Sequence, residues 1–366
     1  MRNTGVLPIQ TIRAMIAARE IAAPADMLPG QLQPASLDLR LGRRAWRVHT
    51  SFLPGRNATV TERVAQIEGH PIDLGDGAVL EKGCVYVVEL QESLKLPAAI
   101  AGSANPKSST GRLDVLTRLI TDRSSAFDLV ERGYQGPLYV EVAPRTFSIV
   151  VRPGTRLNQL RFYRGGATVA AAELERRYRD GDLVRGRGDA HGLQDGLVPV
   201  TIDLQGAGLG ALIGYRAKKH ARHIDLELID HYDSHDFWEP IHFHRDPAII
   251  LDPDDFYILV TAEEVRIPPD CAAEMVAYHT RSGEYRVHYA GFFDPGFGHS
   301  ESGGAGSRAV LEVRSHEIPF ILEHGQTVGR LVYERMIERP RMLYGQGIGS
   351  HYQAQGLKLS KHFRTR

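Results

Sequence analysis

The chain has few of the features that mark a disulfide-bonded, zinc-binding or membrane protein. Among 366 residues there are only two cysteines, Cys84 and Cys271, so a disulfide framework is excluded and reduced thiols in a cytosol are the simplest interpretation. No apolar run reaches the roughly 18 residues that a membrane-spanning helix needs, and Met1–Glu20 lacks the apolar centre of a signal peptide. The formal net charge is zero, which predicts no broad surface for a nucleic acid polymer. We therefore expect a soluble, cytoplasmic protein.

The composition favours strands and turns over helices. Aromatic residues make up only 8% of the chain, whereas glycine (37) and proline (20) are plentiful. Short apolar runs bounded by Gly or Pro, such as Val85–Leu90 and Phe256–Thr261, are typical of strands in a β-barrel or jelly roll. Helices are expected only at the N-terminus and near Ala171–Arg177. The predicted fold class is all-β with a few short helices.

The chain repeats itself at an interval of 171 residues. At this interval like residues recur as pairs: Leu80 and Leu251, Tyr86 and Tyr257, Glu92 and Glu263, Pro97 and Pro268, Glu141 and Glu312. One interval held across separate segments indicates a duplicated domain. We predict copy one at residues 1–175, a linker or mobile arm rich in Gly, Asp and Arg at 176–196, and copy two at 197–366.

Four segments resemble, in order, the motifs of the dCTP deaminase family, which belongs to the dUTPase superfamily. They are LQPASLDLRLG (Leu32–Gly42), NPKSSTGRLD (Asn105–Asp114), VHYAGFFDPGFG (Val287–Gly298) and GSHYQAQG (Gly349–Gly356). Three positions depart from the family's pattern: Lys107 replaces an Arg, Phe292-Phe293 replaces His-Arg, and His351 replaces a Lys. The resemblance implies two tandem dUTPase-like domains, each a distorted β-barrel or jelly roll.

The resemblance also implies roles for the residues at the matching positions. Those that bind the phosphates would be Lys107, Ser108, Ser109, Thr110, Gly111 and Arg112. The nucleoside would be held by hairpin residues Ala290, Gly291, Asp294 and Phe297, and covered by lid residues Tyr352 and Gln355. The catalytic set would be Glu312, Ser108 and Arg112, with Glu141 as the equivalent of Glu312 in copy one.

These residue types suit the hydrolysis of dCTP to dUTP and ammonia. Zinc deaminases activate water with a metal held by His and two Cys, a set that the two isolated cysteines cannot supply, so Glu312 is expected to act as a general base without zinc. Burial in an apolar strand should raise the pKa of Glu312. Hydroxyls, backbone N–H groups and an Arg suit phosphate oxygens. A triphosphate also calls for Mg²⁺, bound through the phosphates rather than by a protein cage.

Each assignment has a structural alternative. Glu312 would otherwise be a rim carboxylate that faces water, and Ser108–Arg112 would be an ordinary turn with a helix cap. Phe297 would be a core residue, and the lid would be a disordered tail. Asp38 and Asp203, in repeated S/T-x-D-L segments, are expected to bind loop backbone. A group of four histidines is expected at a surface or interface, with a metal site as the alternative: His231, His235, His242 and His244.

The two copies have diverged in complementary ways. Copy one keeps KSSTGR, but its segment Asp128–Gly136 lacks the AG-x-x-D pattern. Copy two keeps that pattern in a longer hairpin, but Gly283 in YHTRSG stands where copy one has Arg112. Active sites of the superfamily lie between subunits. The resemblance therefore implies one composite set, with the phosphate segment from copy one and the hairpin, Glu312 and lid from copy two.

The leading hypothesis is a dCTP deaminase, a hydrolase of C–N bonds that supplies dUTP for dTMP synthesis. One alternative is a dUTPase, or a bifunctional dCTP deaminase/dUTP diphosphatase, in which Asp294 would activate the water that attacks phosphorus. An alternative of another class is a non-catalytic nucleotide-binding regulator on the same barrel. The superfamily is commonly threefold, so a homo-oligomer is expected, and a homotrimer is one arrangement that keeps the axis.

Overall fold

The computed structural model describes residues 3–186, 192–277, 285–288, 291–315, 317–346, 352 and 355–364. The chain divides into two compact units. Unit 1 comprises Met1–Ala167, Arg222–His231 and Met336–Arg341, and unit 2 comprises Thr168–Ala221, Tyr232–Arg335 and Met342–Arg366. Each unit thus contains one copy of the repeat, and unit 1 also takes two short segments from later in the chain.

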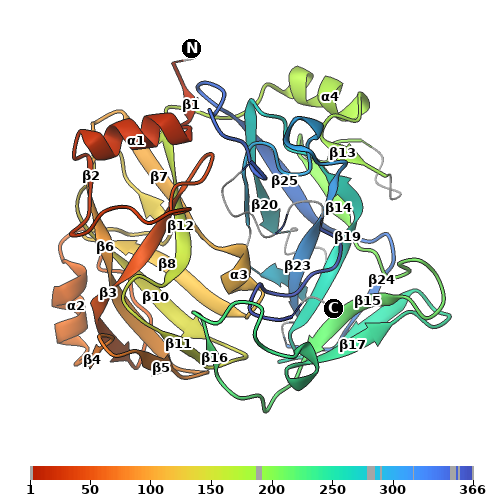
Figure 1. Ribbon diagram of the computed structural model, residues 1–366, viewed down its shortest axis with the longest axis horizontal. Helices are drawn as coiled ribbons and strands as arrows, with labels where there is room; N and C mark the ends of the chain where they lie inside the picture. Colours follow the sequence, from red (N-terminus) through yellow and green to blue (C-terminus); the bar gives the residue numbers. More distant parts are fainter. Residues whose placement is uncertain are drawn as a thin grey trace. The chain divides into compact units, whose positions relative to one another are not determined.

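Unit 1 is built on a large antiparallel sheet (Figure 1). Its strand order is β8 (Val115–Thr121), β10 (Gln135–Pro144), β6 (Val85–Lys95), β3 (Leu37–Val48), β12 (Arg156–Arg164), β7 (Ile100–Pro106) and β9 (Leu129–Val130). Three short strands add to it: β1 (Gly5–Val6) on β12, β2 (Ile21–Ala22) on β6, and β4 (His70–Asp73) on β3. A second, three-stranded sheet has the order β16 (Ile224–Asp225), β11 (Ile149–Val151) and β5 (Ala78–Leu80).

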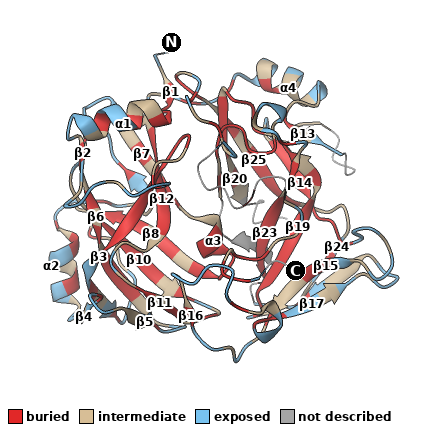
Figure 2. Ribbon diagram, in the orientation of Figure 1, coloured by how far each residue is buried: buried red, intermediate tan, exposed pale blue. Residues whose placement is uncertain are grey.

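Three helices belong to unit 1: α1 (Ile9–Ala17), α2 (Val60–Gln66) and α3 (Ser108–Gly111). The helix expected at the N-terminus is α1, whereas α2 was not expected from the sequence. A capping box starts α2, because the Thr59 hydroxyl accepts from the Glu62 N–H and the Glu62 carboxylate accepts from the Thr59 N–H. Its buried Val60 and Val64 pack on a small cluster of sheet residues, and Figure 2 shows most of the rest of the helix exposed.

Unit 2 contains two main sheets. The first has the order β17 (Trp238–His242), β15 (Leu212–Ala217), β19 (Tyr257–Val265), β23 (Ser307–Ser315) and β21 (Tyr285–His288). The second has the order β14 (Val198–Thr201), β25 (Thr327–Arg335), β20 (Cys271–Ala277) and β22 (Phe292–Phe293). Smaller elements complete the unit: β13 (Val184–Arg185), β18 (Ala248–Leu251), β24 (Phe320–Glu323), α4 (Ala171–Arg179), and the 3-10 turns Ser234–Asp236 and Ser300–Ser302.

The two units have the same strand-pairing order, which confirms the duplication. The path β8-β10-β6-β3-β12-β7-β9 of unit 1 recurs in unit 2 as β21-β23-β19, then β15 and β14, then β25-β20-β22. The register repeats as well, because Glu141 lies opposite Val87 and Glu312 lies opposite Ile258. Along this path the long strand β3 differs, since its counterpart is divided into β14 and β15. Strands hold 43% of the residues and helices 10%, so the predicted all-β class is confirmed.

The hairpins of the two copies differ in length, as the sequence predicted. In unit 1, β9 ends at Val130 and β10 begins at Gln135. In unit 2, β22 ends at Phe293 and β23 begins only at Ser307. The added residues in copy two include a tight turn, in which the Phe297 N–H donates to the Asp294 carbonyl and Gly296 has φ +96°. Proline before glycine at the centre of such a turn is typical of type II.

The segment between the copies is largely folded up to Arg185. The helix expected near Ala171–Arg177 is α4, and β13 pairs Val184 with Val265 of β19. Leu183 is fully buried in the core of unit 2, and its carbonyl accepts from the Tyr333 hydroxyl. The first half of the stretch predicted as a linker is therefore held by strand pairing and burial. In the part of the chain that the structure describes, no helix is long and apolar enough to cross a membrane.

Candidate active site

The predicted phosphate segment of copy one lies directly after β7. Lys107 is the N-cap of the short helix α3, and its carbonyl accepts from the N–H groups of Thr110 and Gly111. Ser109, Thr110 and Gly111 are buried, and Arg112 is only 2% exposed. The Lys107 N–H donates to the Leu157 carbonyl on β12. The segment is one short helical turn, as the alternative predicted, but its N-cap is Lys107 and no side chain caps it. Its hydroxyl and guanidinium groups are of the kind that binds phosphate oxygens.

The side chain of Lys107 forms an ion pair with Asp38, the aspartate of the repeated S/T-x-D-L segment in copy one. Its ammonium contacts Oδ2 of Asp38, and Arg156 Nη1 lies 3.5 Å from the same oxygen. The Asp38 side chain is 2% exposed, so these two cations compensate a buried negative charge. Asp38 was expected to bind loop backbone, but its carboxylate instead pairs with these side chains. Lys107, which replaces the family's Arg, therefore shares its charge with Asp38.

Asp203, the counterpart of Asp38 in copy two, does bind loop backbone as predicted. Its Oδ1 accepts from the N–H groups of Gln205 (3.0 Å) and Gly206 (2.8 Å), while Oδ2 contacts the guanidinium of Arg308. Burial raises the pKa of Asp203, but the bonds from Gly206, Arg308 and Gln205 outweigh it, so the net shift is downward. Asp203 thus remains a carboxylate that holds Arg308 at the start of β23.

Glu141, the glutamate of copy one, forms an ion pair with the strand beside it. It lies on β10 opposite Arg118 of β8 and is 1% exposed. Its Oε1 accepts from both Nε (2.9 Å) and Nη2 of Arg118. The same guanidinium donates to the Ser51 hydroxyl at 2.8 Å and stacks 3.9 Å from the Phe127 ring centre. The carboxylate is thus one half of an ion pair between two neighbouring strands. The sequence had not singled out Arg118, and only the strand register reveals it.

Glu312, the predicted general base, occupies the equivalent place on β23. It is 6% exposed and lies between Ile258 of β19 and His288 of β21 in the sheet register. The alternative of a carboxylate on the water-facing rim is therefore wrong, because the side chain is buried. In copy two the register partner is His288, where copy one has Arg118. The two glutamates thus share a position in the fold and differ in the residue that lies opposite them.

The hairpin of copy two presents mostly buried side chains. Asp294 is 7% exposed and Phe297 is 5% exposed. The Phe297 ring lies 5.2 Å from that of Phe293 and 5.5 Å from that of Tyr344, and Phe297 belongs to the core of unit 2. The Gly291 carbonyl accepts from the Met275 N–H. Core packing, the alternative for Phe297, describes its surroundings in this structure. Ala290 and Gly283 lie outside the described residues.

The lid residues that the structure describes are packed against unit 2. Tyr352 is 8% exposed, and its hydroxyl accepts from the Lys361 N–H at 3.3 Å. Gln355 bonds to both main-chain groups of Arg308, accepting from its N–H at 3.1 Å and donating through Nε2 to its carbonyl at 3.2 Å. The alternative of a disordered tail does not hold for residues 355–364, which are bonded and partly buried. His351 lies outside the described residues.

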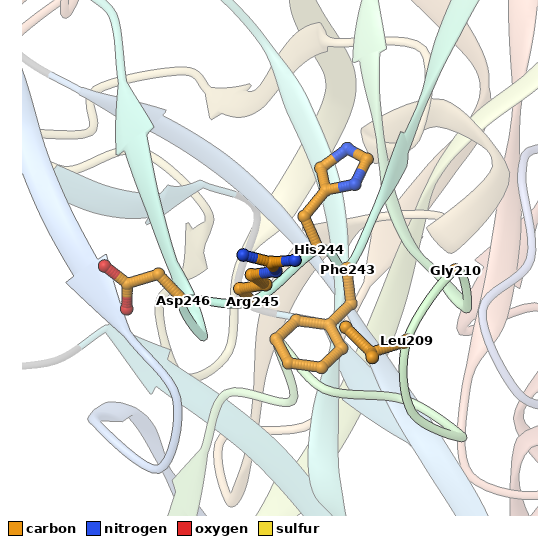
Figure 3. A pocket seen from close by; sticks show the side chains of 6 residues that line it. All are labelled: Leu209, Gly210, Phe243, His244, Arg245 and Asp246. Carbon is orange, nitrogen blue, oxygen red and sulfur yellow. The ribbon is translucent and has the colours of Figure 1, made fainter.

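The histidine group does not form a metal site among the described residues. Within that part of the chain no group of three or more His, Cys, Asp or Glu side chains is close enough to hold an ion. His244 instead lines a surface pocket of about 510 Å³, together with Leu209, Gly210, Phe243, Arg245 and Asp246. Figure 3 shows the imidazole of His244 and the carboxylate of Asp246 pointing away from each other. This pocket contains none of the residues predicted to bind a nucleotide.

The duplicated β architecture is that of dUTPase-like proteins. Two family profiles match consecutive parts of the chain. The "2'-deoxycytidine 5'-triphosphate deaminase (DCD) N-terminal domain" matches residues 3–166. The "2'-deoxycytidine 5'-triphosphate deaminase (DCD), C-terminal domain" matches residues 170–363. The chain therefore belongs to the dCTP deaminase family, in a two-domain form.

Individual proteins agree with this assignment. The crystal structure of a 2'-deoxycytidine 5'-triphosphate deaminase from Agrobacterium tumefaciens is 52% identical, with a TM-score of 0.89, and the match covers 95% of this chain and 100% of that one. A dCTP deaminase from Halorubrum lacusprofundi is 26% identical over 39% of this chain and 68% of its own length. A "dCTP deaminase, dUMP-forming" from a Nocardioides species is 31% identical over 40% of this chain and 73% of its own length.

Proposed function

We propose that this enzyme hydrolyses dCTP to dUTP and ammonia, with Glu312 as the general base and without zinc. Glu312 takes a proton from the water that adds to C4 of cytosine and passes it to N3. It then moves the hydroxyl proton of the tetrahedral intermediate to the amino group, which leaves as ammonia while the C4 carbonyl forms. The observation that supports Glu312 most directly is its place in the fold. It is 6% exposed on β23, at the register position that Glu141 holds in copy one.

The triphosphate is assigned to the segment Lys107–Arg112. Ser108, Ser109 and Thr110 supply hydroxyls, and Arg112 supplies a planar guanidinium that suits two phosphate oxygens. Lys107 contributes a point charge, which it shares with Asp38. This donor set suits anionic oxygens and contains no carboxylate, so Mg²⁺ would be held mainly by the phosphates themselves. When bound, the ion neutralises part of the triphosphate charge.

The nucleoside is assigned to copy two. Ala290 and Gly291 provide main-chain groups for the base, Asp294 accepts from the sugar 3′-hydroxyl, and Phe297 lies against the deoxyribose. The dUTP formed would serve the synthesis of dTMP. A homo-oligomer, such as a homotrimer of two-domain chains, is proposed for the assembly because the superfamily is commonly threefold.

A second candidate is a bifunctional reaction that continues from dUTP to dUMP and pyrophosphate. It is favoured by the relative from Nocardioides, whose name describes it as dUMP-forming. Asp294 would then activate the water that attacks the α-phosphorus, and it is a buried carboxylate on the nucleoside hairpin. A dUTPase alone and a non-catalytic nucleotide-binding regulator remain the further alternatives.

One assay separates these functions. The protein is incubated with dCTP and Mg²⁺, and ammonia and pyrophosphate are measured over time. Ammonia alone supports the deaminase, both products support the bifunctional enzyme, and binding of dCTP without either product supports the regulator. Pyrophosphate from dUTP without ammonia from dCTP would exclude the leading proposal. The assignment of residues fails if Arg112→Ala and Glu312→Gln both keep full activity.

A further inference from the structure

The last described residues of the chain form a strap, defined here as residues 355–364, that is fixed along unit 2. Leu359, Ser360, His362 and Phe363 are all buried. The Tyr232 N–H donates to the His362 carbonyl at 3.0 Å, and the Arg364 N–H donates to the Tyr232 carbonyl at 2.9 Å. These two bonds form a short parallel bridge on either side of Phe363. The strap is therefore held by main-chain pairing as well as by its side chains.

Phe363 is the anchor of the strap. Its side chain is 4% exposed and is surrounded by the rings of Tyr232, Phe237 and Trp238, with centroid distances of 6.4, 5.3 and 6.0 Å. Phe256 continues this aromatic cage at 6.0 Å from Trp238. Edge-to-face contacts at these separations stabilise aromatic clusters beyond the area that they bury. Phe363 is therefore expected to contribute strongly to docking of the strap.

The other end of the strap reaches the strand of Glu312. Arg308 lies on β23 four residues before Glu312 and opposite Glu264 of β19 in the register. Because β19 occupies one edge of β23, and Gln355 bonds to both main-chain groups of Arg308, Gln355 occupies the other edge there. The side chain of Arg308 is held in turn by Asp203. Gln355 is thereby fixed relative to the backbone that carries Glu312.

Tyr352 is tied to the strap itself. Its hydroxyl accepts from the Lys361 N–H, two residues before the anchor, and the Lys358 ammonium lies 5.8 Å from its ring centre. Tyr352 therefore depends on a strap contact for its place, and Gln355 is itself the first residue of the strap. Releasing Phe363 would free Lys361, and with it the bond that orients Tyr352.

We propose that Phe363 is a positioning residue for dCTP, which acts by holding the strap and with it Tyr352 and Gln355. This inference rests on the proposed function. A terminal segment that is already ordered loses less conformational entropy when the nucleotide binds. Phe363 is enclosed by the aromatic cage and is not among the groups that contact the reacting atoms, so its loss affects binding of dCTP rather than the chemical step. If a variant docks its strap in only about a tenth of molecules, the apparent KM rises about tenfold.

Trp238 provides a direct readout of strap docking. The chain has two tryptophans, Trp46 and Trp238, so a Trp46→Phe background leaves only the indole in the aromatic cage. Phe363→Ala, Phe363→Leu and Phe363→Tyr are compared in this background for Trp238 emission and for KM and kcat with dCTP. Phe147→Leu is the matched control, because it truncates a buried phenylalanine of unit 1, which is 1% exposed.

The expected result is a graded one. Phe363→Ala shifts Trp238 emission to the red and raises KM about tenfold, with kcat nearly unchanged. Phe363→Leu gives smaller changes in both emission and KM. Phe363→Tyr and Phe147→Leu keep the emission and KM of the parent. A red shift with KM unchanged, or a fall in kcat alone, overturns the proposal.

Should Phe363→Ala fail to fold, hydrogen exchange of the unaltered protein decides whether the strap is docked before dCTP binds. Slow exchange at residues 359–364 without dCTP supports a pre-docked strap, and fast exchange that slows only with dCTP overturns it. Absence of ammonia from the unaltered enzyme would instead contradict the proposed function.

Discussion

Glu141 and Glu312 hold the same register position in their sheets, but different residues lie opposite them. Glu141 faces Arg118 and accepts two bonds from its guanidinium, whereas Glu312 lies opposite His288. Duplication supplied two copies of one strand glutamate, and the residue at the paired position of the neighbouring strand differs between the copies. In copy one the carboxylate binds the guanidinium of Arg118, which also contacts Ser51 and Phe127. In copy two the equivalent carboxylate is proposed to move a proton.

The two glutamates should therefore respond in opposite ways to the same substitution. We expect Glu312→Gln to lower kcat for dCTP by at least about 10²-fold, the contribution typical of a general base. Glu141→Gln should keep deaminase activity but lower the free energy of unfolding by about 1–3 kcal/mol, because it leaves a partly buried Arg118 without its counter-charge. Ammonia release and urea denaturation measure the two effects.

A double variant provides the control for copy one. Arg118→Gln together with Glu141→Gln removes both charges, so it should recover part of the stability that Glu141→Gln alone loses. If Glu141→Gln abolished ammonia release while the protein stayed folded, the division of roles between the two glutamates would be wrong.

Strand β16 leads to a prediction about acid stability. Its Asp225 accepts from Arg152 through both carboxylate oxygens, at 2.8 and 2.9 Å, and the strand pairs residue 225 with β11 of unit 1. The side-chain bond from Arg152 lowers the pKa of Asp225 below its usual value. A lowered folded-state pKa means that the stabilisation is complete above the unfolded pKa of about 4 and is lost as the pH falls through the folded value.

Asp225→Asn should accordingly destabilise the protein at pH 6, and its difference from the parent should shrink steadily as the pH falls below about 4. Thermal unfolding midpoints of both proteins across this range provide the measurement. A difference between them that stayed constant down to pH 3 would show that the ionised carboxylate is not the stabilising group.

Much of the fold was predictable because the duplication is visible in the sequence as like residues that recur at a constant interval. Apolar runs such as Val85–Leu90 and Phe256–Thr261 lie largely within β6 and β19, and the interval of 171 residues that relates them also relates the strand registers. Helix α2 was missed although Thr59 and Glu62 form a capping box, because seven residues give too short a pattern to distinguish from a loop.

The candidate site was less predictable, since it depends on contacts between residues distant in the chain. Arg118 and Glu141 meet only because β8 and β10 pair in one particular register. Phe363 enters a cage whose members begin at Tyr232, more than a hundred residues earlier. The pairing of β16 was equally unpredictable, because no local sequence pattern indicates that residues 224–225 pair with Ile149 and Val150. Motifs located the residue types, and strand pairing determined their partners.

The two cysteines should differ sharply in reactivity. Cys271 is 2% exposed at the start of β20, and burial raises the pKa of its thiol to about 12. Cys84 is only partly buried. Because the thiolate is the reactive form, a thiol reagent at pH 8 should modify one cysteine in the folded protein and two after denaturation. Cys84→Ser should then reduce the native count to zero, and a rapid second equivalent in the folded protein would contradict the burial of Cys271.

The hairpin of copy two depends on a close approach at Gly298. Its φ is +63°, and a Cβ at this position would lie 2.2 Å from the Val265 carbonyl oxygen and 2.9 Å from the Ser307 nitrogen. Gly298→Ala therefore adds a backbone clash to the strain of a left-handed conformation. We expect it to lower the free energy of unfolding by about 2–4 kcal/mol. Gly303 is the matched control, because it has φ +79° but a Cβ there would meet nothing within 4 Å. Gly303→Ala should cost only about 1 kcal/mol. Equal losses from the two substitutions, measured by urea denaturation, would show that conformational strain alone makes glycine necessary at residue 298.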